Sequence, residues 1–249
     1  MSDRWVNVYD DTERAAAYAR LEFPGTYHLA FRDLPAILGR HVRGTRAIDF
    51  GCGAGRSTRF LRQLGFDVVG LDVSEPMLAQ ARARDPEGDY RLTGEDDLGA
   101  IAAGACDLAL AAFTFDNVPT MERKHALLRS LERALSAGGR IVNLVSSPEI
   151  YLHEWVSFST RDFPENRDAQ NGDRVRIVML DGGDRRPVED VLWTDEAWGE
   201  VYRRAGLRAI ETHRPLGKAG EPCDWVSETT IAPWVIYVLE AIEEPAPRA

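Results

Sequence analysis

The stretch IDFGCGAGRSTRFL, residues 48–61, decides which fold the rest of the sequence can adopt. It joins the apolar run RAIDF, at 46–50, to a segment whose apolar residues have helical spacing, and three glycines stand at every second position between them. A strand that stops at glycines and passes into a helix is typical of the ligand-binding edge of an open α/β sheet. Glycines at such an edge let the backbone approach a bound molecule closely.

Two well-known phosphate-binding motifs do not fit these glycines. A P-loop ends in Gly-Lys-Ser or Gly-Lys-Thr, and the stretch contains no lysine. The dinucleotide motif places its third glycine three residues after the second, where this chain has Arg56. The glycines alone therefore leave two interpretations open, a pocket for another ligand and a simple tight turn.

Strand and helix patterns alternate outward from this stretch. The run CDLALAAF, at 106–113, is apolar almost throughout, as expected of a parallel strand that is covered on both faces. Further strands are expected at 67–73, 89–94 and 140–146, and helices at 57–65, 75–84 and 121–135. This alternation predicts an α/β fold, a doubly wound and mostly parallel sheet with helices on both faces.

The pattern changes on both sides of this core. Two helices are expected before it, at 11–21 and 27–38, and beyond Pro148 the period is lost and aromatic residues gather. Antiparallel strands at 173–182 and 188–193, a helix after Thr194 and final strands at 207–216 and 233–242 complete the expected elements. We expect one domain over 1–249, with a helical N-terminal segment (1–44), a core (45–147), an insertion (148–190) and a part that completes the sheet (191–242).

Composition and charge disfavour several classes of protein. The formal net charge of −10 disfavours a nucleic-acid substrate. No apolar run reaches the ~18 residues of a membrane span, and the first residues lack the apolar core of a signal peptide. The three cysteines lie far apart, which argues against a disulfide framework and a clustered metal site. We expect a cytoplasmic protein, monomeric or homodimeric, without a metal.

Asp72 ends the second predicted strand, 17 residues after Gly55. An acid at this place can accept hydrogen bonds from both hydroxyls of a ribose. With AIDFGCGAGRST, VVGLDVSEPML, LTGEDDL, CDLALAAFTFDNV and LSAGGRIVNLVS in this order over about residues 45–145, the chain resembles the class I S-adenosylmethionine-dependent methyltransferases. The resemblance implies an enzyme with a seven-stranded sheet whose last strand is antiparallel, and S-adenosylmethionine as its cofactor.

The resemblance also implies which residues meet the cofactor. Gly51, Gly53 and Gly55 would pass beneath its methionine part, and Asp72 would hold the ribose hydroxyls. The remaining implied contacts are Asp49 near the cofactor amino group, Val73 and Met77 on the two sides of the adenine, and Ala112 and Phe113 at the methionine end.

One motif departs from the family pattern. The segment GEDDL, 94–98, replaces the usual Gly-Asp-Ala, so it stays open whether Glu95, Asp96 or Asp97 faces the adenine amino group.

Tyrosines of the N-terminal segment are candidates for a lid over the cofactor, as similar methyltransferases have. Tyr18 or Tyr27 could reach the cofactor carboxylate, and the alternative is that both rings pack the helices together.

The segment FTFDNVP, 113–119, follows the fourth strand at the expected crevice. Asp116 could act as a base and Asn117 could orient a substrate by hydrogen bonding. Because Asp and Asn are also favoured at helix N-caps, the alternative is that they cap the helix that follows.

The insertion offers a surface for a flat substrate. Tyr151, Trp155 and Phe158 supply aromatic rings, and Glu154 adds a polar group. His153 could accept a proton from a hydroxyl, and the alternative places it on the surface of an aromatic-anchored cap.

These features favour methyl transfer to a small planar aromatic or heteroaromatic metabolite, on nitrogen or oxygen. The segments AFTFDNVP and SSPEIYLHEW add a faint similarity to bacterial N-methyltransferases of secondary metabolism. Two alternatives remain, a non-catalytic cofactor-binding regulator on the same fold and an RNA or protein methyltransferase.

Overall fold

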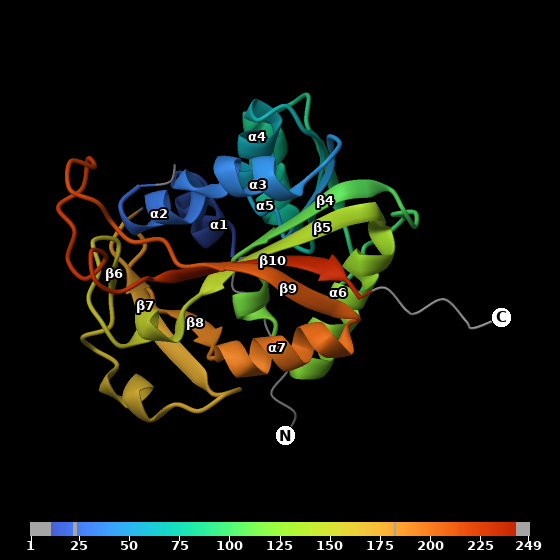
Figure 1. The fold of residues 1–249 in the computed structure, drawn as a ribbon. Helices are drawn as coiled ribbons and strands as arrows, with labels where there is room; N and C mark the ends of the chain where they lie inside the picture. The colour runs from blue at the N-terminus through green and yellow to red at the C-terminus, as the bar shows by residue number, and fades with distance from the viewer. Residues whose placement is uncertain (1–10, 22–23, 182, 243–249) are drawn as a thin grey trace, which may run out of the picture.

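The computed structural model describes residues 11–21, 24–181 and 183–242, so residues 1–10 of the expected N-terminal segment lie outside the described part. In that part the chain forms a seven-stranded sheet with the order β3-β2-β1-β4-β5-β10-β9 (Figure 1). Its strands are β1 (Arg46–Phe50), β2 (Asp67–Asp72), β3 (Asp89–Leu92), β4 (Cys106–Ala112), β5 (Leu135–Ser146), β9 (Leu207–His213) and β10 (Trp234–Ala241). The first five are mutually parallel, and β10 runs antiparallel to both β5 and β9, which confirms the predicted fold.

Side chains of alternating residues along each strand are buried under different helices. Leu108 and Leu110 of β4 pack with one group of helices, whereas Ala109 and Ala111 pack with another. The first group is α2 (Thr26–Arg32), α3 (Leu34–His41) and α4 (Arg56–Gln63), and the second is α6 (Met121–Ala134) and α7 (Asp195–Arg204). Two hydrophobic layers therefore enclose the sheet, as the alternation of elements predicts.

Two boundaries differ from the sequence expectation. The helix expected at 27–38 is interrupted at Asp33, because Pro35 lies in the first turn of α3 and a proline there favours a new helix start. The glycines after α6 do not follow the helix as a separate turn, since β5 already begins at Leu135 and includes them.

The insertion forms a second, three-stranded sheet, which we call the cap. It contains β6 (Phe158–Ser159), β7 (Arg174–Met179) and β8 (Val188–Val191), and the antiparallel pairing of β7 with β8 was expected from the sequence. Of two 3₁₀ turns, η3 (Pro148–Tyr151) connects β5 to the cap, and η4 (Pro164–Asp168) lies between β6 and β7.

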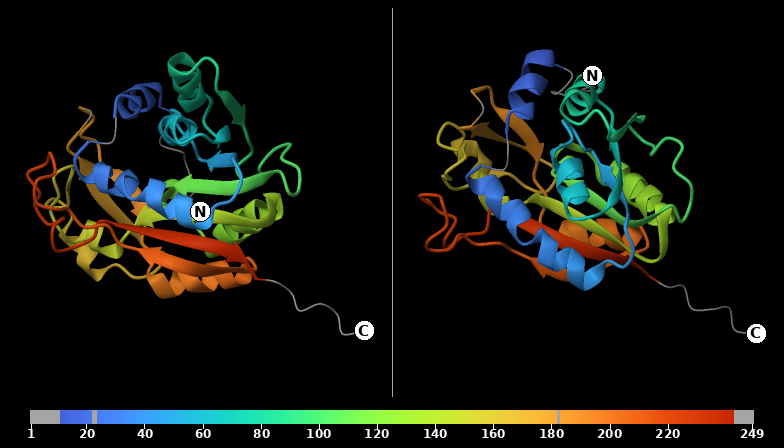
Figure 2. Two further views of the ribbon diagram at one scale, coloured as in Figure 1. Left: turned by 45° about the horizontal axis from the view of Figure 1, so that its top comes forward. Right: turned by 90° about the horizontal axis from the view of Figure 1, so that it is seen from above.

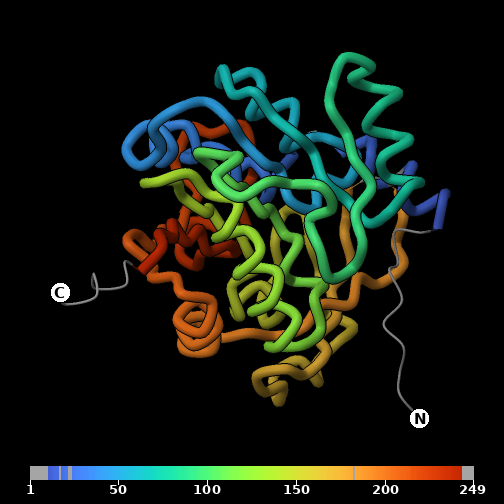
Figure 3. Tube along the Cα trace, turned by 90° about the vertical axis from the view of Figure 1, so that its right-hand side faces the viewer, coloured from blue at the N-terminus to red at the C-terminus, as the bar shows by residue number. Residues whose placement is uncertain are grey.

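The first helix, α1 (Thr12–Ala19), lies between the cap and α5 (Glu75–Arg84), as Figures 2 and 3 show. The Arg14 guanidinium reaches the cap, where Nη2 donates to the backbone carbonyls of Arg186 (3.3 Å) and Pro187 (2.7 Å). The helix therefore bridges two parts of the chain at the sheet edge that carries the glycines. Within the described residues, no helix has the length and apolar character needed to cross a bilayer.

Candidate active site

The glycines after β1 form a tight loop that is tied to the neighbouring strand. The amides of Gly51 and Cys52 donate to the carbonyl of Leu71, at 2.8 and 2.9 Å. Gly55 has φ +76°, and a Cβ there would lie 2.6 Å from Tyr90 Oη, so only glycine suits this backbone and this packing. The glycines of this loop therefore offer only backbone atoms to a molecule bound beside them.

Asp72 connects this loop to β2. Its Oδ2 accepts from the Gly53 amide at 2.7 Å, and its Oδ1 accepts from the Ser74 amide at 2.8 Å. Because a carboxylate has about four lone-pair sites, the two oxygens retain capacity for a diol. The residues present therefore fit the ribose of an adenosyl group.

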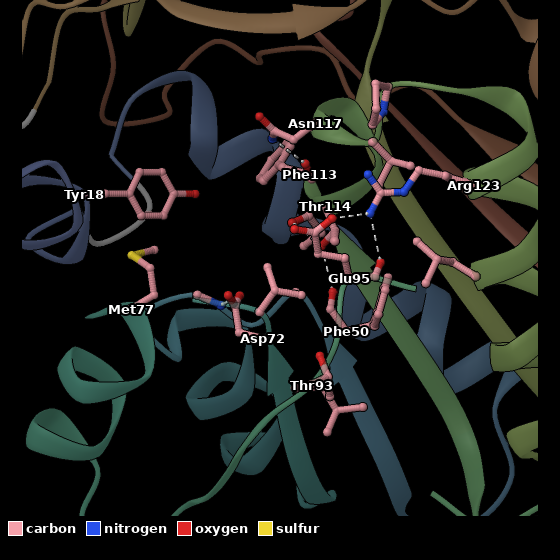
Figure 4. A pocket seen from close by; sticks show the side chains of 18 residues that line it. Tyr18, Phe50, Asp72, Met77, Thr93, Glu95, Phe113, Thr114, Asn117 and Arg123 are labelled. Carbon is pink, nitrogen blue, oxygen red and sulfur yellow. Dashed lines mark hydrogen bonds and ion pairs between the residues drawn. The ribbon is translucent and has the colours of Figure 1, made fainter. Parts of the chain in front are cut away.

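A cavity of about 870 Å³, partly open to solvent, lies above Asp72 and is called cavity 1 (Figure 4). Gly51, Gly53, Asp72, Ala112 and Phe113 line it, together with Tyr18, Phe50, Leu71, Val73, Met77, Thr93, Glu95, Thr114, Asn117, Val118, Pro119, Arg123 and Leu127. Most of the residues that the sequence assigned to the cofactor therefore meet in one place.

Among the three neighbouring acids, Glu95 is the one that lines cavity 1. Its carboxylate lies 3.2 Å from Arg123 Nη2 (Figure 4). Arg123 Nε also donates to Asp96 at 2.8 Å. The Asp97 carboxylate instead accepts from the Gly99 amide. The structure thus brings Glu95 and Arg123 together, and the sequence analysis overlooked Arg123, which lies 28 residues further along the chain.

Asp49 lies behind the glycine loop and lines neither cavity 1 nor the two smaller cavities, cavities 2 and 3, that are described below. It is fully buried, and its Oδ2 accepts from Ser57 Oγ (2.7 Å) and Thr58 Oγ1 (2.6 Å) at the start of α4. Burial raises its pKa to about 6, and the nearby charge of Asp72 adds to this shift. Asp49 therefore supports the loop by holding α4 in place, and its place near the cofactor amino group stays a prediction.

A smaller cavity of about 380 Å³ adjoins the other side of the glycine loop and is called cavity 3. Arg56 lines it, and its guanidinium carbon lies 5.5 Å from the ring centre of Tyr18 and 5.0 Å from that of Tyr27. A cation among aromatic rings beside bare backbone is suited to a carboxylate such as that of a methionine group. In the sequence, Arg56 was recognisable only as a departure from the dinucleotide motif.

The two lid tyrosines have different surroundings. Tyr18 lines cavities 1 and 3, and its hydroxyl is 3.3 Å from Arg56 Nη2. Tyr27 is buried and its hydroxyl donates to Met179 Sδ at 3.3 Å. Tyr18 therefore has the position expected for cofactor contact. Tyr27 packs in the interior, as the packing alternative expects.

Cavity 2 lies between the sheet edge and the cap and encloses about 420 Å³, a volume that includes space open to solvent. It shares Tyr18, Phe113 and Asn117 with cavity 1, so the two spaces adjoin. Its other lining residues are Tyr27, Asp116, Ser146, Ile150, Tyr151, Phe158, Ile177, Met179, Val188, Asp190 and Trp234. This arrangement suits a small molecule beside the end of a larger one.

Two buried carboxylates lie in cavity 2. Asp116, in the 3₁₀ turn η2 (Thr114–Asn117), accepts from the amide of Ser146 at 3.0 Å and from its hydroxyl at 3.0 Å. Asp190, on β8, accepts from the Tyr151 hydroxyl at 3.0 Å. Burial and the neighbouring Asp190 raise the pKa of Asp116 to about 7, and burial raises the pKa of Asp190 to about 6.

A buried lysine lies behind these acids. Lys124 is 0% exposed, and its ammonium donates to the Phe115 carbonyl and lies 5.1 and 5.0 Å from the ring centres of Trp193 and Trp198. Burial lowers its pKa to about 7, against the attraction of both carboxylates. No sequence pattern indicated Lys124 or Asp190, because the rings of Trp193 and Trp198 and the Tyr151 hydroxyl that contact them belong to other segments of the chain.

The capping alternative for Asp116 and Asn117 is wrong. The N-cap of α6 is Thr120, whose side chain accepts from the Arg123 amide at 3.2 Å. Asn117 Nδ2 instead donates to the Phe113 carbonyl at 3.4 Å.

The cap residues expected at the substrate divide into two groups. Tyr151 and Phe158 line cavity 2. Trp155 is 2% exposed and donates to the Ile150 carbonyl, and Glu154 accepts from Ser159 and Thr160, so these two hold the cap together and line none of the three cavities.

His153 also lies outside the three cavities. Its Nε2 is 3.1 Å from Glu149 Oε2, and its ring packs edge-on against Trp155, as the surface alternative expects. Of the two candidate bases, only Asp116 borders a cavity. In the described part of the chain, His, Cys, Asp and Glu form no group of three or more that could hold a metal.

Comparisons with known proteins agree with this geometry. A family model described as a methyltransferase domain matches residues 48–143. A trans-aconitate 2-methyltransferase of Variovorax paradoxus is 30% identical over 196 residues, which cover 76% of this chain and 70% of the relative. A ubiquinone biosynthesis O-methyltransferase of Pseudomonas aeruginosa is 27% identical over 189 residues, 71% of this chain and 72% of the relative.

A solved structure extends the likeness to the fold. An S-adenosylmethionine-dependent methyltransferase of Mesorhizobium loti superposes with a TM-score of 0.59 over 83% of this chain and 96% of its own, at 22% identity. The chain therefore belongs to the class I S-adenosylmethionine-dependent methyltransferases, and S-adenosylmethionine is its cofactor.

Proposed function

We propose that this enzyme methylates a nitrogen or oxygen of a small planar aromatic or heteroaromatic molecule bound in cavity 2. The observation that carries the proposal is the junction of the two cavities at Tyr18, Phe113 and Asn117. Cavity 1 fits the adenosyl group, so the methionine end would reach this junction. An acceptor in cavity 2 would then meet the methyl group there.

The lining of cavity 2 supports a flat acceptor. Tyr27 and Trp234 have ring centres 5.7 Å apart and nearly parallel planes, and Phe158 lies 5.1 Å from Tyr27. Such rings offer apolar faces on which a planar molecule can stack. An acceptor with several carboxylates, such as trans-aconitate, would instead meet Asp116 and Asp190, the only charged side chains among the described residues that line this cavity.

The roles of the cofactor residues follow from their positions. Asp72 would accept from the ribose hydroxyls, Glu95 would face the adenine, and Arg56 with Tyr18 would bind the methionine carboxylate. When bound, S-adenosylmethionine supplies an electrophilic methyl group on a positively charged sulfur.

Asp116 is the proposed general base. The accepting atom would use its own electron pair to form the bond to the methyl carbon. The methyl–sulfur bond would break and leave its electrons on sulfur, and the proton of the acceptor would pass to the Asp116 carboxylate. A base of this kind contributes about 10²–10⁴-fold to the rate. For a nitrogen that already has a free lone pair, the contribution would be much smaller.

The test combines an acceptor screen with one variant. Purified enzyme is incubated with S-adenosylmethionine and a panel of phenols, aromatic amines and aliphatic polycarboxylates, and methylated products are identified by mass spectrometry. For a phenolic acceptor, Asp116→Asn should lower kcat by about 10²–10⁴-fold while S-adenosylhomocysteine still binds with wild-type affinity. A panel in which only aliphatic polycarboxylates are methylated would refute the proposal.

A further inference from the structure

The charged side chains among the described lining residues of cavity 2 are all acidic. Its charged lining residues are Asp116 and Asp190, and no lysine, arginine or histidine is among its described lining residues. Both carboxylates belong to side chains that are at least nine-tenths buried, with residue exposures of 6% and 8%. Buried charge of this kind is costly unless a partner of opposite charge offsets it.

The nearby cations do not supply that partner inside the cavity. The Lys124 ammonium is directed to the Phe115 carbonyl and to two tryptophan rings, none of which lines cavity 2. Arg14 lies at the cap with its Nε 3.9 Å from Asp184. On β8 itself, Glu189 next to Asp190 adds a further negative charge. Lys124 and Arg14 both attract the Asp190 carboxylate from outside the cavity, so the described lining itself holds two acids and no cation.

Aromatic rings around the cavity also favour a cation. Tyr27, Phe113, Phe158 and Trp234 line it and form one cluster, with ring centres 4.7 Å apart between Phe113 and Trp234 and 5.6 Å apart between Phe158 and Trp234. The faces of such rings attract ammonium groups. Two independent features of the lining, its carboxylates and its rings, thus suit the same ligand charge.

The two acids differ in their position relative to the methyl donor. Asp116 belongs to η2, whose neighbours Phe113 and Asn117 also line cavity 1. Asp190 belongs to the cap and is held by Tyr151, and neither residue lines cavity 1. Asp190 is nevertheless an electrostatic neighbour of Asp116, and β8 contacts η2, so a molecule that presents an atom to the donor beside Asp116 also reaches Asp190.

We propose that the acceptor is a planar molecule that also carries a protonated amine, and that Asp190 is the residue that selects this amine. This inference rests on the proposed function, since it assumes that the acceptor occupies cavity 2. Asp190 recognises the ammonium by charge, Tyr151 orients the carboxylate, and the aromatic cluster packs against the ring of the acceptor. A carboxylate in place of the amine is rejected.

Three probes with one phenol ring and different tails test the charge preference. Tyramine carries a cation, 4-ethylphenol is neutral, and 3-(4-hydroxyphenyl)propanoate carries an anion. Each is titrated calorimetrically into enzyme saturated with S-adenosylhomocysteine. We expect tyramine to bind at least tenfold more tightly than 4-ethylphenol, with the propanoate weakest. Equal affinities, or tighter binding of the propanoate, would overturn the inference.

Two variants test the residue. Asp190→Asn keeps the shape of the side chain and can still accept from Tyr151, so it should reduce the affinity for tyramine to that for 4-ethylphenol and leave the neutral probe unchanged. Asp162→Asn, an exposed change on the same cap, should keep the wild-type order of the probes. An amine preference that persists in Asp190→Asn would refute the role of Asp190. The wild-type series decides the charge preference even if the variant folds poorly, which its S-adenosylhomocysteine affinity reports.

The same probes separate this inference from the proposed function. If the three probes bind equally and the phenol oxygen is methylated, the function stands and the amine preference fails. If tyramine binds selectively but no planar acceptor is methylated, the charge preference stands and the proposed reaction fails. If none of the probes binds at millimolar concentration, both are overturned.

Discussion

Asp116 should give the enzyme a pH dependence near neutrality. The carboxylate accepts a proton only when it is ionised, and burial together with Asp190 raises its pKa to about 7. The attraction of Lys124 and the hydrogen bonds from Ser146 oppose this shift. For an acceptor that must lose a proton, kcat/KM should therefore fall as the pH decreases below about 7, approaching tenfold per pH unit. Initial rates at low substrate from about pH 5.5 to 9 measure this; a flat profile would contradict the assignment.

Replacing Lys124 should shift the pH dependence of kcat/KM. In Lys124→Met the nearby positive charge is lost, so the pKa of Asp116 rises further and the acidic limb of the profile should move to higher pH by about one unit. The chain has one other lysine, Lys218, which is exposed, so Lys218→Met is the matched control. A change in kcat at all pH values, with no shift of the limb, would indicate that Lys124 only supports packing.

Asp72 should decide cofactor affinity. Loss of two hydrogen bonds to a charged acceptor, each contributing about 1.5–3 kcal/mol, should weaken S-adenosylhomocysteine binding in Asp72→Asn by at least a hundredfold. Asp67→Asn changes the exposed acid at the other end of the same strand and should leave the affinity unchanged. Calorimetric titration measures both variants, and an unchanged affinity in Asp72→Asn would refute this role.

Residues whose partners are close in sequence were predictable, and residues whose partners are distant were not. Gly53, Asp72 and Ser74 form one local hydrogen-bonded unit, and its motif was visible in the chain. Asp190 meets Tyr151 across 39 residues. No periodicity or spacing indicates that pair, because the cap must first fold back over the sheet edge.

At the scale of elements, the turn between β1 and α4 depends on the lack of a side chain at Gly55. A Cβ there would lie 2.6 Å from Tyr90 Oη. The Tyr90 ring is buried and its hydroxyl donates to Asp85 at 3.0 Å, so the ring cannot easily move. Gly55→Ala should lower the free energy of unfolding by about 1–2 kcal/mol from backbone strain and by about 1–3 kcal/mol more from overpacking.

Gly65, at the other end of α4, is the control for this prediction. It also has a positive φ, of +90°, but a Cβ there would meet no atom within 4 Å. Gly65→Ala should therefore show only the strain of about 1–2 kcal/mol. Urea unfolding compares the two variants, and equal losses would show that the contact with Tyr90 does not matter.

The elements themselves were largely predictable because their signals are local. Apolar runs gave the central strands, and Thr194 caps α7, where its side chain accepts from the Ala197 amide. The interruption at Asp33 was not expected, because it also depends on distant groups: the Asp33 carboxylate is held by Arg32 and by His213 of β9. The long-range contact with His213 thus adds to the local effect of Pro35 in dividing one helical pattern into two helices.

At the scale of the whole molecule, Arg14 joins the first helix to the cap. Its bonds to the carbonyls of Arg186 and Pro187 keep α1 beside the cavities that Tyr18 lines. In Arg14→Ala, hydrogen exchange of the α1 amides should become about 10- to 100-fold faster, as expected for the loss of about 1.4–2.8 kcal/mol of local stability. S-adenosylhomocysteine affinity should fall in parallel.

Glu13→Ala is the control for this change, because Glu13 is exposed on the same helix. It should leave both the exchange rates and the affinity at wild-type values. If Arg14→Ala accelerated exchange throughout the sheet as well, the arginine would contribute to global stability rather than to closure of the lid.

The reversed direction of β10 has a practical consequence. The strand begins at Trp234, beside cavity 2, and ends at Ala241, paired with Leu207 at the start of β9. At about 3.3 Å per residue, its far end lies more than 20 Å from the cavities, at the opposite edge of the sheet (Figure 1). A linker that leaves β10 past Ala241 can therefore tether the enzyme to a bead or a sensor surface with both cavities facing the solution.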